Sequence, residues 1–122
     1  MTAVKPQDLI VYISGPMTGL PEYNYPLFNR VADELRAGGF TVCNPAEFFG
    51  GLGDRTREEY MRESVRCLVA CDYVVTLPDW DRSDGAILEI EIAKQIGIPV
   101  TNYFDDETPT RATTVLSQKG IV

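Results

Sequence analysis

The sequence contains no histidine, the residue that most often acts as a general acid or base near neutral pH. Proton chemistry would therefore depend on carboxylates, tyrosine, lysine or water. Cysteine is also scarce: Cys43, Cys67 and Cys71 form no CxxC pair. An odd cysteine count without histidine argues against both a disulfide framework and a zinc site. We therefore expect no metal and no cofactor.

Positive charge is limited, with 11 Lys and Arg against 18 Asp and Glu and a net charge of −7. This balance argues against electrostatic binding of a nucleic-acid backbone, although local backbone donors can still hold a small anion. The sequence has no apolar run near the roughly 18 residues of a membrane span and no signal-like start, so we expect a cytoplasmic protein. Its 122 residues, 44% of them hydrophobic, predict one compact domain over residues 1–122.

Apolar runs and helical periods alternate along the chain. Residues 8–15 form a near-continuous run of strand formers, which is typical of a buried parallel strand. The remaining patterns predict strands at 40–45, 72–78 and 98–104, helices at 26–37, 57–70 and 84–96, and a short terminal helix at 109–119. This alternation predicts a single doubly wound, flavodoxin- or Rossmann-like α/β sheet of four to five mainly parallel strands with helices on both faces.

One predicted helix carries a carboxylate on its apolar side. Ser83 is a typical N-cap and Gly97 a typical helix stop. The apolar arc of this helix consists of Ala86, Ile90, Ile92, Ala93 and Ile96. Glu89 falls in the middle of the arc, whereas Glu91 lies on the solvent face. A carboxylate on a core face needs a partner, a proton or a cleft, so Glu89 is the functional candidate. The alternative is a rim residue whose head reaches water.

The expected position of the site follows from the fold class. In a doubly wound sheet, the loops leaving the carboxyl ends of the strands converge at one edge, where ligands bind. Tyr12, the loop 15–25, Trp80 and the start of the Glu89 helix should meet there. A tyrosine hydroxyl beside Glu89 would hold the carboxylate ionised and aimed, as a carboxylate nucleophile requires. The amides near Gly85 at the helix start are a further candidate site for a phosphate.

Two motifs frame this candidate site. They are Tyr12-Ile13-Ser14-Gly15 after an apolar run, and Ser83-x-Gly85-x-x-x-Glu89-x-x-x-Ala93 after the strand that begins at Asp72. Together they resemble the nucleoside 2-deoxyribosyltransferase superfamily, whose members cleave or exchange N-glycosidic bonds in nucleosides and nucleoside monophosphates. An uncharacterised branch from bacterial and phage genomes is more similar still, through residues 12–20, Asn24-Tyr25-Pro26, Phe28-Asn29, Asn44-Pro45, Tyr60-Met61-Arg62 and Cys71-Asp72.

The resemblance implies roles for individual residues. Glu89 matches the nucleophilic glutamate and Tyr12 the tyrosine that orients it. Ser83 matches a serine that helps to hold the 5′-phosphate in nucleotide-cleaving members, with Gly85 in the same turn. The implied mechanism is a retaining double displacement through a glycosyl ester on Glu89. The chain departs from the pattern at Ser64, where many relatives have an aspartate that meets the base or the sugar.

The predicted activity is therefore that of a nucleoside or nucleoside-monophosphate N-glycosidase or deoxyribosyltransferase. Its expected substrate contacts are Gly15, Met17, Asn24, Ser64, Trp80, Arg82, Ser83 and Gly85. Arg82 favours a nucleotide over a nucleoside, because a guanidinium suits bidentate phosphate contacts.

The expected partner is a small nucleoside or nucleotide, with neither nucleic acid nor a membrane, and the resemblance implies a homodimer or larger homo-oligomer. Two alternatives stay open. Ser64 favours a nucleotide-binding module or regulator without catalysis. The other alternative is a sheet that only supports an interface, in which Trp80 and the tyrosine-rich loop form an exposed aromatic patch.

Overall fold

Four parallel strands form the central sheet of the computed structural model, which describes residues 5–51 and 54–104. The strand order is β2-β1-β3-β4, and every neighbouring pair is parallel. The strands are β1 (Ile10–Ser14), β2 (Thr41–Cys43), β3 (Tyr73–Thr76) and β4 (Val100–Asn102). The predicted doubly wound α/β sheet is confirmed, with four strands in the described part of the chain. The terminal helix predicted for 109–119 lies outside the described residues.

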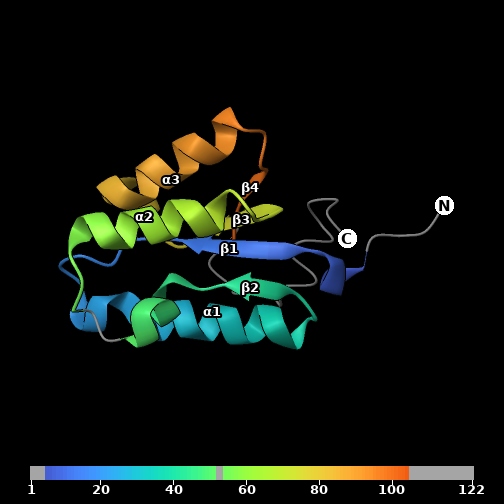
Figure 1. Ribbon diagram of the computed structural model, residues 1–122. Helices are drawn as coiled ribbons and strands as arrows, with labels where there is room; N and C mark the ends of the chain where they lie inside the picture. The colour runs from blue at the N-terminus through green and yellow to red at the C-terminus, as the bar shows by residue number, and fades with distance from the viewer. Residues whose placement is uncertain (1–4, 52–53, 105–122) are drawn as a thin grey trace.

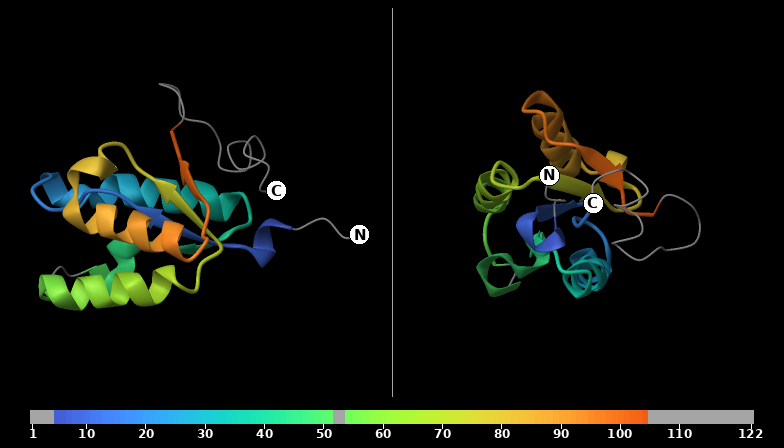
Figure 2. Two further views of the ribbon diagram at one scale, coloured as in Figure 1. Left: turned by 90° about the horizontal axis from the view of Figure 1, so that it is seen from above. Right: turned by 90° about the vertical axis from the view of Figure 1, so that its right-hand side faces the viewer.

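Three α-helices cover the two faces of the sheet: α1 (Tyr25–Ala37), α2 (Arg57–Leu68) and α3 (Asp84–Gln95). Side chains alternate along a strand, so Val11 and Ile13 of β1 join the core under α1, whereas Tyr12 joins the core under α2 and α3. Figure 1 shows α1 on one side of the sheet, and Figure 2 shows α2 and α3 side by side on the other. None of these described helices is long and apolar enough to cross a membrane.

The helix starts follow local capping chemistry. Thr56 and Glu59 form a capping box at the start of α2, and the Ser83 hydroxyl caps α3 by accepting from the Ala86 amide at 3.2 Å. The apolar arc of α3 is shorter than predicted. The helix ends at Gln95, and Ile96, the next residue, is 53% exposed because it lies beyond the last helical turn that faces the sheet.

The strand order places a topological switch point between β1 and β3. The chain leaves β1 toward α1 on one face and leaves β3 toward α3 on the other, so a crevice forms at the carboxyl ends of the two strands. Gly15 follows β1 directly, and a Cβ atom at this position would lie 2.8 Å from the Leu77 Cβ. A glycine is therefore required where the segments leaving β1 and β3 approach each other.

Candidate active site

A cavity of about 400 Å³ lies at this switch point. Its walls come from the loop after β1, the turn segment η3 (Pro45–Gly51), α2 and the start of α3. Several of the residues singled out from the sequence line it together, namely Gly15, Met17, Ser64, Ser83, Gly85 and Glu89. At about 400 Å³ it falls within the usual size range of a small-molecule site.

Glu89 is buried at the base of the cavity, with 6% of its surface exposed. One carboxylate oxygen accepts a hydrogen bond from the Tyr12 hydroxyl, and the other accepts from the Ser14 hydroxyl at 2.7 Å. Tyr12 and Ser14 are two residues apart on β1, so both side chains point to the face that α3 covers. No ion pair among the described residues involves Glu89. Hydroxyl groups, and no cation, therefore orient this carboxylate.

Burial is the main cause of the pKa shifts of Glu89 and Tyr12. Burial raises the pKa of Glu89, and the hydroxyls of Tyr12, Ser14 and Ser64 act in the opposite direction without cancelling the rise. The pKa of Tyr12 is raised well above its ordinary value, first by burial and then by the charge of Glu89. Tyr12 therefore remains a protonated donor. The hydroxyl donors offset only part of the free-energy cost of an ionised, buried Glu89, which suits a group that reacts with an electrophilic carbon.

Ser14 is a site residue that the sequence reasoning missed. It is fully buried and polar within an otherwise apolar strand. The alternation of β1 contained the information needed to find it, because any residue two positions from Tyr12 shares its face.

Three of the expected substrate contacts do not line this cavity. Asn24 donates from its side-chain amide to the Pro16 carbonyl at 3.0 Å and so ties the loop to itself. Trp80 lines a separate hollow of about 230 Å³ at the ends of β3 and β4. The Arg82 side chain is 82% exposed, and its guanidinium lies 4.0 Å from the Asp79 carboxylate. The phosphate contact expected from Arg82 thus has no counterpart at the cavity.

Two other arginines do line the cavity, and the sequence reasoning did not select them. The Arg55 guanidinium lies 4.8 Å from the centre of the Phe49 ring and 3.4 Å from the Glu59 carboxylate. Arg57 is the first residue of α2 and makes no ion pair with the residues described. Among the described lining residues, these two are the cations and Glu89 is the one carboxylate. The cavity therefore presents two guanidinium groups, of which that of Arg55 also pairs with the carboxylates of Asp54 and Glu59.

The parallel sheet, the cavity at its switch point and the buried carboxylate define a small α/β protein with a crevice where sheets of this class usually bind ligands. The chain belongs to the family described as Domain of unknown function (DUF4406), whose model matches residues 9–102. Its fold is similar to that of a 2-deoxyribosyltransferase from the psychrotolerant bacterium Bacillus psychrosaccharolyticus, described as a biocatalyst for the synthesis of antiviral and antitumoral nucleosides. The TM-score is 0.61 at 17% identity, over 87% of this chain and 81% of the other. No curated protein sequence matches the chain.

Proposed function

We propose that the protein is a nucleoside or nucleoside-monophosphate N-glycosidase or deoxyribosyltransferase with Glu89 as its nucleophile. One observation carries this proposal: a carboxylate 6% exposed lies in a cavity of about 400 Å³ and is held by hydroxyl donors without a cation. A buried carboxylate with no ion pair costs folding free energy, and such groups cluster at functional sites. The fold similarity to a 2-deoxyribosyltransferase supports the choice of reaction.

In the proposed reaction, a Glu89 oxygen attacks the anomeric carbon of the sugar. The carbon–nitrogen bond breaks, its electron pair goes to the base, and a glycosyl ester forms on Glu89. Water or a second base then attacks the same carbon and releases the carboxylate. Two inversions give net retention of configuration. Tyr12 and Ser14 hold the carboxylate in place through both steps.

The charges of the cavity favour a nucleoside monophosphate over a nucleoside. Arg55 and Arg57 supply guanidinium groups, which bind phosphate through paired hydrogen bonds. Ser83 and Gly85 place the start of α3 at the same cavity, where a helix N-terminus favours an anion. These groups take over the role that Arg82 was expected to play.

A second candidate function is nucleotide binding without catalysis. The observation that favours it is Ser64, which is buried beside Glu89. The resemblance to the nucleoside 2-deoxyribosyltransferase superfamily implies an aspartate at this position. Glu89 is thus the one carboxylate among the described lining residues, and an acid that could assist the leaving base is missing there. This alternative predicts nucleotide binding with no product.

The test is to incubate the purified protein with a panel of nucleosides and nucleoside monophosphates and to measure free base by chromatography. The wild type and Glu91→Gln, an exposed control on the same helix, should release base, whereas Glu89→Gln should not. Equal release by Glu89→Gln would rule out the proposed nucleophile. No release by any variant, together with thermal stabilisation by a nucleotide, would establish the binding function instead.

We also propose that the chain forms a homodimer. The neighbouring side chains Ile87 and Leu88 on α3 are 44% and 45% exposed, and a second copy would cover this apolar surface. Light scattering at working concentration tests this proposal, and a monomer would contradict it.

A further inference from the structure

Three consecutive residues in the loop after β1 adopt the left-handed backbone conformation, and none of them is glycine. Glu22, Tyr23 and Asn24 have φ angles of 53°, 54° and 62°. Asparagine tolerates this conformation, but it is unfavourable at Glu22 and Tyr23 because Cβ crowds the following carbonyl oxygen. Glycine would form the same turn without this strain. The sequence therefore keeps side chains in this turn at a cost in conformational free energy.

Hydrogen bonds and the start of a helix hold the strained turn in place. The Asn24 side-chain amide donates to the Pro16 carbonyl at 3.0 Å, and the Tyr23 backbone amide donates to the Leu20 carbonyl at 3.0 Å. The next residue, Tyr25, begins α1. Because the segment is held on both sides, its left-handed conformation is set before any ligand arrives, which is how a binding contact is preorganised.

Tyr23 lies at the mouth of the cavity that contains Glu89. It lines the cavity, yet 55% of its surface is exposed. The Tyr25 ring covers part of the Tyr23 ring, with centroids 5.9 Å apart and planes at 47°. Glu22, which has nearly the same φ angle, does not line the cavity. A large exposed aromatic ring at a cavity is a surface that a ligand would cover.

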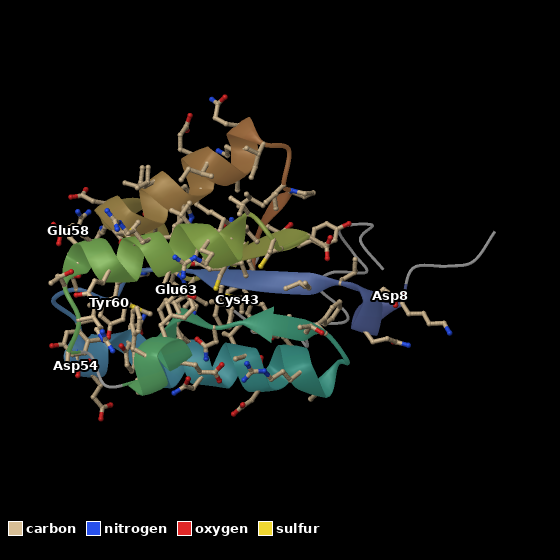
Figure 3. All side chains as sticks on the ribbon, viewed as in Figure 1. Asp8, Cys43, Asp54, Glu58, Tyr60 and Glu63 are labelled. Atoms are coloured by element: carbon tan, nitrogen blue, oxygen red, sulfur yellow. The ribbon has the colours of Figure 1, made fainter. Side chains whose placement is uncertain are left out.

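The cavity lies between two walls from opposite faces of the sheet. The loop 15–25 leads into α1 on one face, whereas α2 and α3 cover the other. Figure 3 shows Tyr60 pointing from α2 toward the layer that contains α1. Arg57 and the start of α3, which suit a phosphate, belong to the second wall, and Tyr23 belongs to the first. A ligand that spans the two walls would therefore place different groups on Arg57 and on Tyr23.

The chemistry of Tyr23 suits a nucleotide base better than a phosphate or a sugar. The face of an aromatic ring carries partial negative charge, which repels an anion. The proposed reaction holds the sugar at Glu89, which is buried at the base of the cavity and not at its mouth. A planar base stacks on an aromatic face, and the contact strengthens with the area that the base covers. A purine, with two fused rings, would cover more of Tyr23 than a pyrimidine does.

We infer that Tyr23 is a specificity-determining residue whose ring stacks on the base of the bound nucleotide at the mouth of the cavity and favours purines over pyrimidines. This inference rests on the proposed function, because it takes the ligand to be a nucleotide. The strained turn holds the ring in position, so little conformational entropy is lost when the base binds. The contact depends on the area of the ring and does not require the Tyr23 hydroxyl.

The test compares Tyr23→Gly with Glu22→Gly, its matched control. Glycine suits the left-handed conformation at both positions, so thermal melts should show an unchanged or higher Tm for each variant. Binding of deoxyribonucleoside monophosphates is measured by titration calorimetry in the Glu89→Gln background, where the proposed turnover is blocked. Tyr23→Gly should raise the dissociation constants of purine nucleotides about tenfold or more and those of pyrimidine nucleotides by less. Glu22→Gly should change neither.

Two further measurements identify the groups that make the contact. Tyr23→Phe keeps the ring and removes the hydroxyl, so it should keep the affinity for every nucleotide. The ligand 2-deoxyribose 5-phosphate has no base, so Tyr23→Gly should bind it as tightly as the protein that retains Tyr23. Stacking on the base thus predicts a loss of affinity that needs both the Tyr23 ring and the base of the ligand.

The outcomes separate this inference from the proposed function. Unchanged nucleotide affinity in Tyr23→Gly, an equal loss for 2-deoxyribose 5-phosphate, or an equal loss in Tyr23→Phe would overturn the stacking role and leave the glycosidase proposal standing. Equal losses for purine and pyrimidine nucleotides would overturn the purine preference. Nucleotide binding that depends on the Tyr23 ring, without release of base by the wild type, would support the inference and overturn the glycosidase. If no nucleotide binds the protein, both proposals are wrong.

Discussion

The structure contains two pairs of a tyrosine and a glutamate in very different surroundings. The Tyr103 hydroxyl donates to Glu34, and Arg30 lies 3.2 Å from the other Glu34 oxygen. The Glu34 side chain is 34% exposed. The Tyr12 hydroxyl donates to Glu89, which is 6% exposed, and the other Glu89 oxygen meets the Ser14 hydroxyl in place of a cation.

The difference supports the proposal that Glu34 is a structural carboxylate and Glu89 a functional one. At Glu34, an arginine and water compensate the negative charge, so the pair only joins α1 to the segment after β4. At Glu89, hydroxyl dipoles offset part of the cost of burial, and the pKa stays raised. The remaining free-energy cost of the buried negative charge is relieved when the carboxylate bonds to an electrophilic carbon, so a carboxylate of this kind at a cavity is suited to such a reaction.

The largest effect should come from removing the two carboxylates in turn. Glu89→Gln is expected to lower kcat/KM for base release by about 10³-fold or more, because an amide cannot form the glycosyl ester. Glu34→Gln should leave kcat/KM within about twofold, since Glu34 lies outside the cavity. Steady-state assays of free base test both variants. A similar loss in the two would erase the distinction between the pairs.

The two tyrosines should differ in how they affect the pH profile. Tyr12→Phe removes a donor that lowers the Glu89 pKa, so this pKa should rise further and the acid limb of kcat/KM should move to higher pH. The rate at neutral pH should fall roughly 10- to 100-fold. Ser14→Ala should shift the limb the same way by less, and Tyr103→Phe should not shift it. An acid limb that moves to lower pH in Tyr12→Phe would contradict this assignment.

The arginines near the two tyrosine–glutamate pairs should also differ in their effect on ligand binding. Arg30 contacts Glu34 directly, whereas Arg57 shares a cavity with Glu89 and makes no ion pair with the described residues. Arg57→Ala should weaken binding of a nucleoside monophosphate about tenfold and leave the nucleoside unaffected. Arg82→Ala is the control and should change neither. Calorimetric titration at two salt concentrations measures the effect, and equal losses for nucleotide and nucleoside would exclude a phosphate contact.

Local periodicity was sufficient to predict the fold and the burial of Glu89. The apolar run 8–15 predicted β1, and the helical wheel placed Glu89 on a buried face. Both conclusions depend on spacing within one element, and the structure agrees with each. Ser14 was within reach of the same reasoning, because its position two residues from Tyr12 fixes its direction.

The residues that line the outer part of the cavity depend on turns and on contacts between distant segments. Asp79 adopts a left-handed conformation with φ 64°, and the following turn carries Trp80 and Arg82 away from the cavity although they precede Ser83 directly. Conversely, Tyr60 and Arg55 reach the cavity because Phe49, also left-handed at φ 53°, brings η3 against α2. The turn at Phe49 continues into the left-handed Gly50 and Gly51, which mark a turn without fixing its direction, and no glycine marks the turn at Asp79.

The smallest predicted effect concerns stability, which the Glu→Gln substitutions at Glu89 and Glu34 should change in opposite directions. Because the Glu89 pKa is raised on folding, ionising this group disfavours the folded state as the pH rises past the ordinary carboxyl value of about 4.3. Glu89→Gln removes this penalty, so it should raise the Tm at pH 7 by on the order of 5 °C, and by much less near pH 4. Glu34→Gln removes an exposed ion pair and should lower stability by about 0.5 kcal/mol or less.

Thermal melts from pH 4 to pH 8 measure both variants against the wild type. A lower Tm of Glu89→Gln at pH 7 would mean that the hydroxyl donors offset the whole free-energy cost of burying the ionised carboxylate. Glu89 would then be a stabilising group like Glu34, and the proposed cost of its ionisation would be absent. A gain that grows with pH and coincides with loss of base release would show that the protein keeps an unstable carboxylate for its chemistry.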